Sequence, residues 1–233
     1  MAERPLRLNK ALKELGLASR REGDRLICQG EVTVNGIIVK EPWHHVDLDK
    51  DIIALTSTGN DHLKDKKYIA YYKPKGIVST FAQKEGKSLG DIFLTFQALS
   101  YAGRLDKESE GLMILSDDGL FIASVRAPEK LKEKEYEVTV AETVHEGALE
   151  KMRQGMMLDG KALRKAYVSK RSPHSFAIIL TEGKNRQVRR MASKVGLTVT
   201  ALKRVRIGPV TVEGLQPNQW RELTQEEIRL LSK

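Results

Sequence analysis

The chain has 233 residues, which is long enough for one large domain or for a small module followed by a medium-sized one. Hydrophobic residues make up 40% of the sequence, and no apolar run reaches the length of a membrane span, so we expect a soluble, cytoplasmic protein without a membrane partner. The single cysteine excludes an internal disulfide, and no cysteine or histidine cluster has metal-ligand spacing, so we expect no structural metal.

The formal net charge of +9 is unevenly distributed along the chain. Residues 161–210 hold thirteen lysines and arginines against one acidic residue, Glu182. Such a dense positive field is destabilised by self-repulsion unless an anion binds to it, and nucleic acid is the usual partner. A solvated, lysine-rich surface is the alternative. Arginines dominate the densest part, however, and their forked geometry suits phosphate. The charge therefore favours a nucleic-acid partner.

Two short helices are predicted near the N-terminus. Leucines recur at helical spacing over residues 8–15, and Gly16 should end that helix. The residues 19–22, Ser-Arg-Arg-Glu, have the pattern of a capping box, in which Ser19 and Glu22 satisfy each other's amides at the start of a second helix. Gly30 should end this helix in a left-handed conformation.

A hairpin and a domain boundary are predicted next. Two short strands within residues 32–39 should meet at the Asn35-Gly36 turn, and residues 51–55 form a further candidate strand. The polar stretch 56–67 then marks a boundary. We assign residues 1–60 to a small module, 61–67 to a flexible linker and 68–233 to a larger domain.

The predicted helices of the module carry a set of basic residues. From charge alone, a solvated helix face would be the better interpretation. The order of elements, however, resembles the α-L RNA-binding module first known from a small-subunit ribosomal protein. The resemblance implies docking on structured RNA through shape and phosphate contacts. The candidate RNA-binding residues are Arg7, Lys10, Arg20, Arg21 and Arg25.

Strands and helices alternate irregularly in the larger domain. Strands are predicted over residues 68–72 and 77–81, separated by a turn that begins at Lys73, for which a turn lysine at a sheet edge is the simplest interpretation. Helices are predicted over residues 143–154, capped by Thr143 and Glu146, and over residues 184–195. We expect an α+β fold around a mixed, largely antiparallel sheet.

A polar loop bracketed by glycines begins Gly103-Arg104-Leu105-Asp106 and leads into an apolar strand over residues 112–115. Loops that are held by a rigid sheet are where catalytic groups concentrate. For a Gly-Arg-x-Asp fragment alone, the better interpretation would be an arginine and an aspartate that pair across a turn.

The longer string is not generic. Residues 103–119 resemble the catalytic motif of the pseudouridine synthase group that includes RsuA, RluB and RluF. Lys73-Pro74, the tyrosine motif at 134–136, the arginine motif at 182–191 and the basic, hydrophobic motif at 202–208 agree with that group in the same order. The chain is therefore identified as a member of this group, and the residues of its motifs are more similar to the RluF-like members than to the RsuA-like ones.

The resemblance implies a role for several residues. Asp106 would be the nucleophile, which either adds to C1′ of the uridine or removes a proton from C2′. Tyr136 would stack on the base and take part in removing the C5 proton, and Leu202 would lie beneath the uracil; strand spacing alone would place both in the core. The family's active-site arginine corresponds to Arg189, which lies between the buried and exposed faces of its helix, where its cation would keep Asp106 ionised.

A uridine stacked in folded RNA must be extruded before it reaches Asp106. Arg104 is expected to fill the gap and bind phosphate, or else only to position the loop. Arg186 and Arg190, on the predicted outward face of the helix, are as compatible with solvated charges as with phosphate contacts. The full set of candidate substrate-binding residues is Arg104, Leu202, Lys73, Arg186, Arg190 and Arg204.

The predicted function is isomerisation of a uridine to pseudouridine in ribosomal RNA, with large-subunit (23S) RNA favoured over small-subunit (16S) RNA or tRNA. The reaction needs no cofactor, and we expect a monomer. Two alternatives stay open. A non-catalytic RNA-binding or ribosome-assembly protein would leave the Asp106 motif unexplained. A hydrolase acting on a sugar or phosphate ester would need a second carboxylate that the sequence does not identify.

Overall fold

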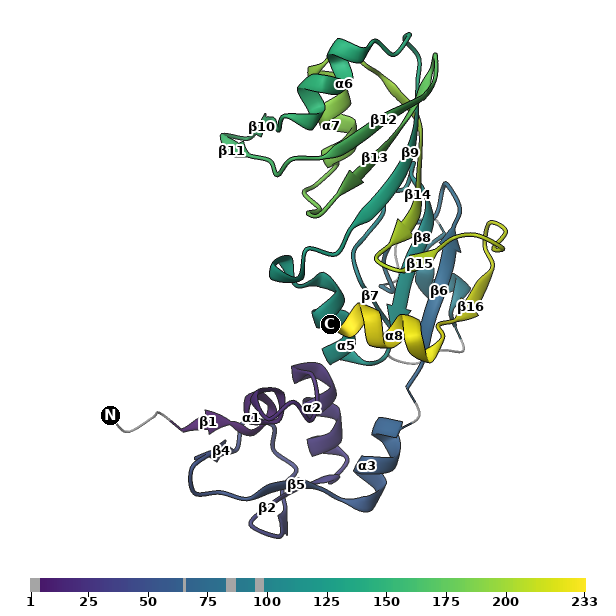
Figure 1. Cartoon of the computed structure of the whole chain (residues 1–233). Helices are drawn as coiled ribbons and strands as arrows, with labels where there is room; N and C mark the ends of the chain where they lie inside the picture. Colours follow the sequence, from purple (N-terminus) through teal and green to yellow (C-terminus); the bar gives the residue numbers. More distant parts are fainter. Residues whose placement is uncertain (1–4, 65, 83–86, 95–98) are drawn as a thin grey trace. The chain divides into compact units, whose positions relative to one another are not determined.

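The computed structural model of the protein describes residues 5–64, 66–82, 87–94 and 99–233 (Figure 1). The chain separates into two compact units, one formed by residues 1–67 and 116–123 and the other by residues 68–115 and 124–233. The polar stretch thus ends where the first unit gives way to the second. Within the described ranges, the helices are too short or too polar to cross a membrane.

The two predicted N-terminal helices are present as α1 (Leu8–Glu14) and α2 (Arg20–Cys28). Leu8 and Leu12 are buried in a small core, whereas Leu15 is 46% exposed, because the helix ends before it and the chain turns away at Gly16. The capping box is only half formed. Ser19 accepts a hydrogen bond from the Glu22 amide, but the Glu22 carboxylate pairs with Lys66 instead of with the start of its own helix.

Short strands complete the first unit. The predicted Asn-Gly turn is confirmed, since Asn35 and Gly36 both have positive φ, 53° and 81°. The turn joins β2 (Val32–Val34) to β3 (Ile37–Ile38), and β5 (Ile53–Leu55) pairs with the other side of β2. A separate two-stranded ladder joins β1 (Leu6–Arg7) to β4 (His45–Val46).

Part of the stretch that we assigned to a linker, residues 61–67, is helical. Residues Ser57–Lys64 form helix α3, and the Thr56 hydroxyl accepts a hydrogen bond from the Gly59 amide at its start. Gly59, which suggests a turn in the sequence, has a packing role, because a Cβ atom there would lie 2.9 Å from the carbonyl oxygen of Glu31. Asp65, also assigned to the linker, lies outside the described residues.

The second unit is built on a mixed, largely antiparallel sheet, as predicted. Nine of the described strands form it, in the order β12-β13-β9-β14-β8-β6-β16, with β7 beside β8 and β15 beside β14. The pair β8–β14 is parallel. The strands are β6 (Tyr68–Lys73), β7 (Ser100–Tyr101), β8 (Glu110–Ser116), β9 (Lys134–Val140), β12 (Tyr167–Ser172), β13 (Ser175–Leu180), β14 (Val199–Ile207), β15 (Val210–Thr211) and β16 (Trp220–Glu222).

Helices and one small hairpin surround this sheet. Figure 1 shows α6 and α7 beside β12 and β13, near the hairpin of β10 and β11. Val188, Met191 and Ala192 of α7 are buried in the core of this unit, as the helical spacing of apolar residues over 188–195 predicts. The bounds are α4 (Leu89–Ile92), α5 (Gly119–Arg126), η1 (Pro128–Lys130), α6 (Glu146–Arg153), β10 (Met157–Leu158), β11 (Lys161–Ala162), α7 (Gln187–Lys194) and α8 (Gln225–Ser232).

Two predicted helix starts and one predicted strand in this unit are wrong. The helix expected from residue 143 begins at Glu146, preceded by His145, whose side chain makes no capping bond. The helix expected from residue 184 begins at Gln187, because Arg186 adopts a left-handed conformation with φ of 48°. The strand expected over residues 77–81 is absent from the described structure, where Val78 makes only an isolated bridge to Ser88.

Candidate active site

A cavity of about 460 Å³ in the second unit brings together residues from four of the sequence motifs. Its walls come from the loop after β7, from strands β9 and β14, and from the segment that leads into α7. The predicted site residues that line it are Arg104, Asp106, Tyr136, Arg186 and Leu202. Residues separated by almost a hundred positions in the sequence therefore line one cavity.

The backbone of the Asp106 loop is fixed on both sides of the aspartate. The Ser79 hydroxyl donates to the Leu105 carbonyl at 2.6 Å and accepts from the Leu105 amide at 3.2 Å. On the other side, the Ser109 amide donates to the Asp106 carbonyl at 3.0 Å. Ser79 lies where the sequence predicts a strand, and the sequence does not predict its hydrogen bonds to Leu105. No motif identifies it, because the contact depends on the fold.

Asp106 has its ion-pair partner in Arg186. The Arg186 Nη1 atom lies 3.4 Å from the Asp106 carboxylate. The Arg186 side chain is 49% exposed and the Asp106 side chain is 31% exposed. The left-handed backbone of Arg186 places this residue just before α7 instead of on its surface. The expectation that Arg186 points outward from a regular helix is therefore wrong, and its side chain reaches the pocket.

Arg189 binds the backbone around the loop. Its guanidinium donates to the carbonyl oxygens of Glu108 and Val199, both at 3.1 Å, and to the Ser109 hydroxyl at 3.4 Å. Burial lowers the pKa of Arg189, and the neighbouring Arg186 acts in the same direction, whereas Asp106 and Glu108 oppose the shift. Arg189 thus lies within electrostatic reach of Asp106, but its hydrogen bonds hold the end of the Asp106 loop.

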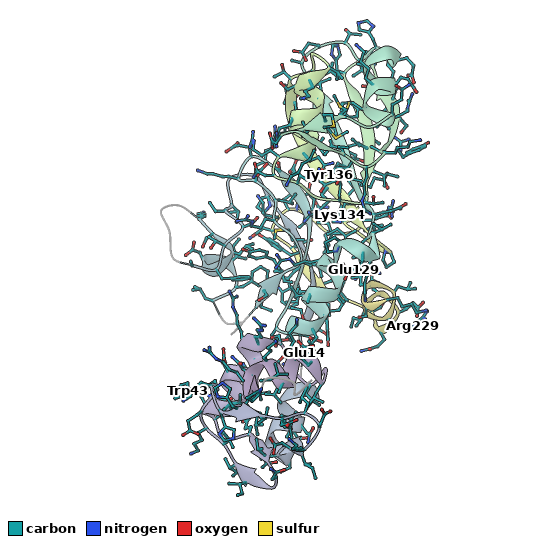
Figure 2. All side chains as sticks on the ribbon, turned by 90° about the vertical axis from the view of Figure 1, so that its left-hand side faces the viewer. Glu14, Trp43, Glu129, Lys134, Tyr136 and Arg229 are labelled. Carbon is teal, nitrogen blue, oxygen red and sulfur yellow. The ribbon has the colours of Figure 1, made fainter. Side chains whose placement is uncertain are left out.

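An apolar wall faces the polar loop across the cavity. Tyr136 of β9 and Leu202 of β14 both line it and are 8% and 6% exposed. The strands are adjacent, with Tyr136 opposite Arg204 and Leu202 opposite Val138 in the ladder (Figure 2 labels Tyr136). A flat aromatic ring and a branched aliphatic side chain suit the two faces of a planar base.

Two of the candidate substrate-binding cations are buried. Lys73 is fully buried at the end of β6, with its ammonium donating to the Pro74 carbonyl at 2.8 Å. Burial lowers its pKa to about 8, although Glu108 and Glu110 oppose the shift. β6 lies between β8 and β16, so the interpretation of Lys73 as a turn lysine at a sheet edge is wrong.

Arg204 lies beneath the glycine that follows the loop. It is 2% exposed, and its Nε donates to the Leu112 carbonyl at 2.7 Å. A Cβ atom at Gly111, where φ is 109°, would lie 2.2 Å from the Arg204 carbonyl oxygen, so only glycine fits the close approach of β8 and β14. Lys73 and Arg204 thus donate to backbone carbonyls near the ends of β6 and β8, and neither is among the residues that line the cavity.

The remaining predicted cations of the second unit are near the surface. Arg104 is exposed at the cavity. Arg190 pairs with Asp159, and Lys194 of the same helix donates to the Met157 carbonyl at 2.7 Å. Arg190 therefore contacts the β10–β11 hairpin, whereas Arg104 is free to reach a ligand that enters the cavity.

The predicted basic residues of the first unit are exposed or half-buried. Arg7, Arg20, Arg21 and Arg25 are exposed, and Lys10 is half-buried. No group of three or more potential metal ligands occurs among the described residues of either unit. The chemistry that this arrangement offers is thus a carboxylate beside a guanidinium, facing an apolar wall large enough for a planar base.

Comparisons with known proteins agree with both halves of the chain. The family model of RNA pseudouridylate synthases matches residues 67–194, and the S4 domain model matches residues 6–53. The dual-specificity RNA pseudouridine synthase RluF of Escherichia coli K12 is 36% identical over 96% of this chain and 77% of its own length. SVR1 of Arabidopsis thaliana, a chloroplast protein named provisionally as a ribosomal large subunit pseudouridine synthase, is 34% identical over 98% of this chain and 61% of its own length.

A solved structure agrees as well. A crystal structure of a pseudouridylate synthase superposes with a TM-score of 0.72 at 30% identity, covering 97% of this chain and 99% of that one. The match includes the S4 domain and the larger domain, so both the order and the fold of the two units are shared with a solved enzyme.

Proposed function

The protein belongs to the RNA pseudouridine synthase family and carries an N-terminal S4 domain, and from this premise we propose that it isomerises a specific uridine of large-subunit ribosomal RNA with Asp106 as the nucleophile. The observation that carries the proposal is the Asp106 carboxylate, which lines the cavity 3.4 Å from the Arg186 guanidinium. Membership of the family gives the reaction class, and the geometry supports the choice of residue.

The proposed reaction is an internal exchange of bonds. The N1–C1′ bond of uridine breaks, the uracil turns, and a C5–C1′ bond forms; C5 loses a proton and N1 gains one. No electrons enter or leave. The Asp106 carboxylate serves the first step, either by adding to C1′ or by removing the C2′ proton. Both routes need the ionised form, which an adjacent guanidinium favours.

We assign the two arginines different roles. Arg186 contacts the Asp106 carboxylate directly and would hold it in position in the cavity. Arg189 adds a more distant charge and positions the loop through its bonds to Glu108 and Ser109. This division modifies the expectation from the sequence, in which Arg189 is the cation that acts on the Asp106 carboxylate.

The apolar wall would hold the base. Tyr136 would stack on the uracil and take part in removing the C5 proton late in the reaction, and Leu202 would lie beneath the ring. A base reaches this cavity only after extrusion from its stack, which costs about a few kcal/mol. Arg104, exposed beside Asp106, would bind phosphate and occupy the vacated place, and cations on the surface would offset the cost.

The RNA is proposed more coarsely than the reaction. The amino-acid sequences of the motifs resemble those of the RluF-like members, and the name of one relative, SVR1, refers to the large ribosomal subunit. We propose that the protein acts as a cytoplasmic monomer on 23S rRNA, with 16S rRNA or tRNA as the alternative substrate.

The proposal is tested by mapping pseudouridine after incubation with unmodified 23S rRNA, 16S rRNA and a tRNA pool. Carbodiimide adducts followed by primer extension locate each product as a stop. We expect one stop or a few stops in 23S rRNA and no release of free uracil. Stops only in 16S rRNA or tRNA would identify a different RNA substrate for the same reaction. Free uracil without stops would favour a hydrolase, and no product at all would contradict the proposal.

A further inference from the structure

An exposed tryptophan lies at the tip of a tight turn in the S4 unit. The His44 amide donates to the Glu41 carbonyl at 3.0 Å, which closes a β-turn with Pro42 and Trp43 at its two central positions. Proline favours the first of these positions, but nothing in turn geometry requires tryptophan at the second. Trp43 is nevertheless 65% exposed, and Figure 2 shows it on the outside of its unit.

The backbone around this tryptophan is anchored on both sides. The Leu8 amide donates to the His44 carbonyl at 2.7 Å, and the Asn9 amide donates to the Pro42 carbonyl at 3.4 Å. Directly after the turn, His45 pairs with Arg7 in the β1–β4 ladder. The turn is thus tied to the beginning of α1, and it presents the indole ring from a fixed backbone. The unit's core is formed without this ring.

Exposed basic residues accompany Trp43, together with acidic residues that include Asp51, which lies within electrostatic reach of His44. Lys40 and His44 are exposed beside it in the chain, and Glu41 is the acidic residue of the turn. Arg7, directly opposite His45 in the ladder, is also exposed. A protein-binding hot spot is usually a desolvated apolar patch from which charge is depleted, and this surface has the opposite character. An aromatic ring among cations is the pattern that binds single-stranded nucleic acid.

We propose that Trp43 stacks on an unpaired base of the RNA substrate while Arg7 and its basic neighbours bind the adjoining phosphates. The inference rests on the proposed function, since it takes the substrate RNA as the ligand. It adds a recognition element for single-stranded RNA to a unit whose helices are expected to bind structured RNA. Loops and bulges with accessible bases would therefore be favoured over a continuous duplex.

Fluorescence of Trp43 gives a direct test that does not depend on catalysis. The chain has two tryptophans, so Trp220→Phe leaves Trp43 as the only indole. We expect a single-stranded oligouridylate, and a transcribed rRNA fragment with unpaired loops, to quench this emission. A fully paired RNA duplex of equal length, at equal occupancy by filter binding, should quench it far less.

Two substitutions separate stacking from packing. Trp43→Ala should weaken binding of the single-stranded RNA about tenfold, within the range of one stacked base, whereas Trp43→Phe should retain most of the affinity. Unchanged emission on saturation with RNA, or equal affinities for all three proteins, would overturn the inference. Quenching without pseudouridine formation would contradict the proposed function alone, and pseudouridine formation with unaltered Trp43 emission would contradict this inference alone.

Discussion

Two groups of cations near the Asp106 loop differ in burial, and the difference indicates which of them can meet a ligand. Lys73 and Arg204 are 0% and 2% exposed and satisfy backbone carbonyls beneath the loop. Arg104 and Arg186 line the cavity, where an incoming anion can meet them. All four are basic residues of motifs in the sequence. The fold alone determines which of them face the cavity and which are buried against backbone carbonyls.

The largest expected effect on stability is at the buried arginine. Arg204→Ala removes a buried side chain and leaves the Leu112 carbonyl without its donor, so the free energy of unfolding should fall by about 2–4 kcal/mol. The matched control is Arg190→Ala, at a surface ion pair, which should change it by less than about 1 kcal/mol. Urea denaturation followed by circular dichroism measures both. Equal losses would contradict a structural role for the buried Arg204 side chain.

Lys73 predicts a pH dependence of stability. Its pKa falls from 10.5 in the unfolded chain to about 8 in the folded protein. Below pH 8 both states are charged, and folding bears the full cost of burying the ammonium. Between those two values the folded protein binds fewer protons, so the stability of the wild type should rise with pH relative to Lys73→Met, by up to about 3 kcal/mol.

Denaturation of both proteins across this alkaline range measures the effect, because titrations common to both cancel in the difference. A difference in stability that does not change with pH would mean that Lys73 is not an ionising buried group.

The two arginines at the loop should respond differently to conservative replacement. Arg186→Gln removes the direct partner of Asp106, so kcat/KM should fall by about 10- to 100-fold, and Arg186→Lys should restore part of it. Arg189→Gln should lower activity together with thermal stability, because it releases the Glu108 carbonyl and the Ser109 hydroxyl. Single-turnover pseudouridine formation and thermal melting measure the two effects. If Arg189→Gln lowered activity more than Arg186→Gln and left the melting temperature unchanged, Arg189 would be the functional partner of the Asp106 carboxylate.

The smallest effects are expected on the exposed α2 face of the S4 unit. Arg21→Gln combined with Arg25→Gln should weaken RNA binding only a few-fold and should reduce the slope of log K against log salt by about 0.7–0.9 per lost phosphate contact. Filter binding across a salt series measures the slope. An unchanged slope would show that this face is only solvated.

The sequence was informative where local chemistry determines structure. The Asn35-Gly36 turn, the end of α2 at Gly30 and the buried stripe of α7 follow from turn residues and helical spacing, and all are present. The sequence misled where distant contacts override local patterns. Gly59 suggests a turn but permits close packing of α3, and Arg186 suggests a helical surface residue but adopts a left-handed backbone facing Asp106.

The candidate site was predicted unevenly for the same reason. The motif containing Asp106 is long and distinctive, so its residues could be identified by resemblance. The bonds from Ser79 to Leu105 and the burial of Lys73 arise only when separate segments pack together. A linear pattern gives the types of residue at a site, but it does not give the solvent exposure of each one.

The central claim is that Asp106 performs the chemistry while cations elsewhere bind the RNA. Asp106→Asn preserves the size of the side chain and removes its charge, so a comparison with wild type on unmodified 23S rRNA tests this claim most directly. We predict that carbodiimide-dependent stops disappear while the Kd for the RNA changes by less than about threefold. Stops that persist with the asparagine variant would contradict the account.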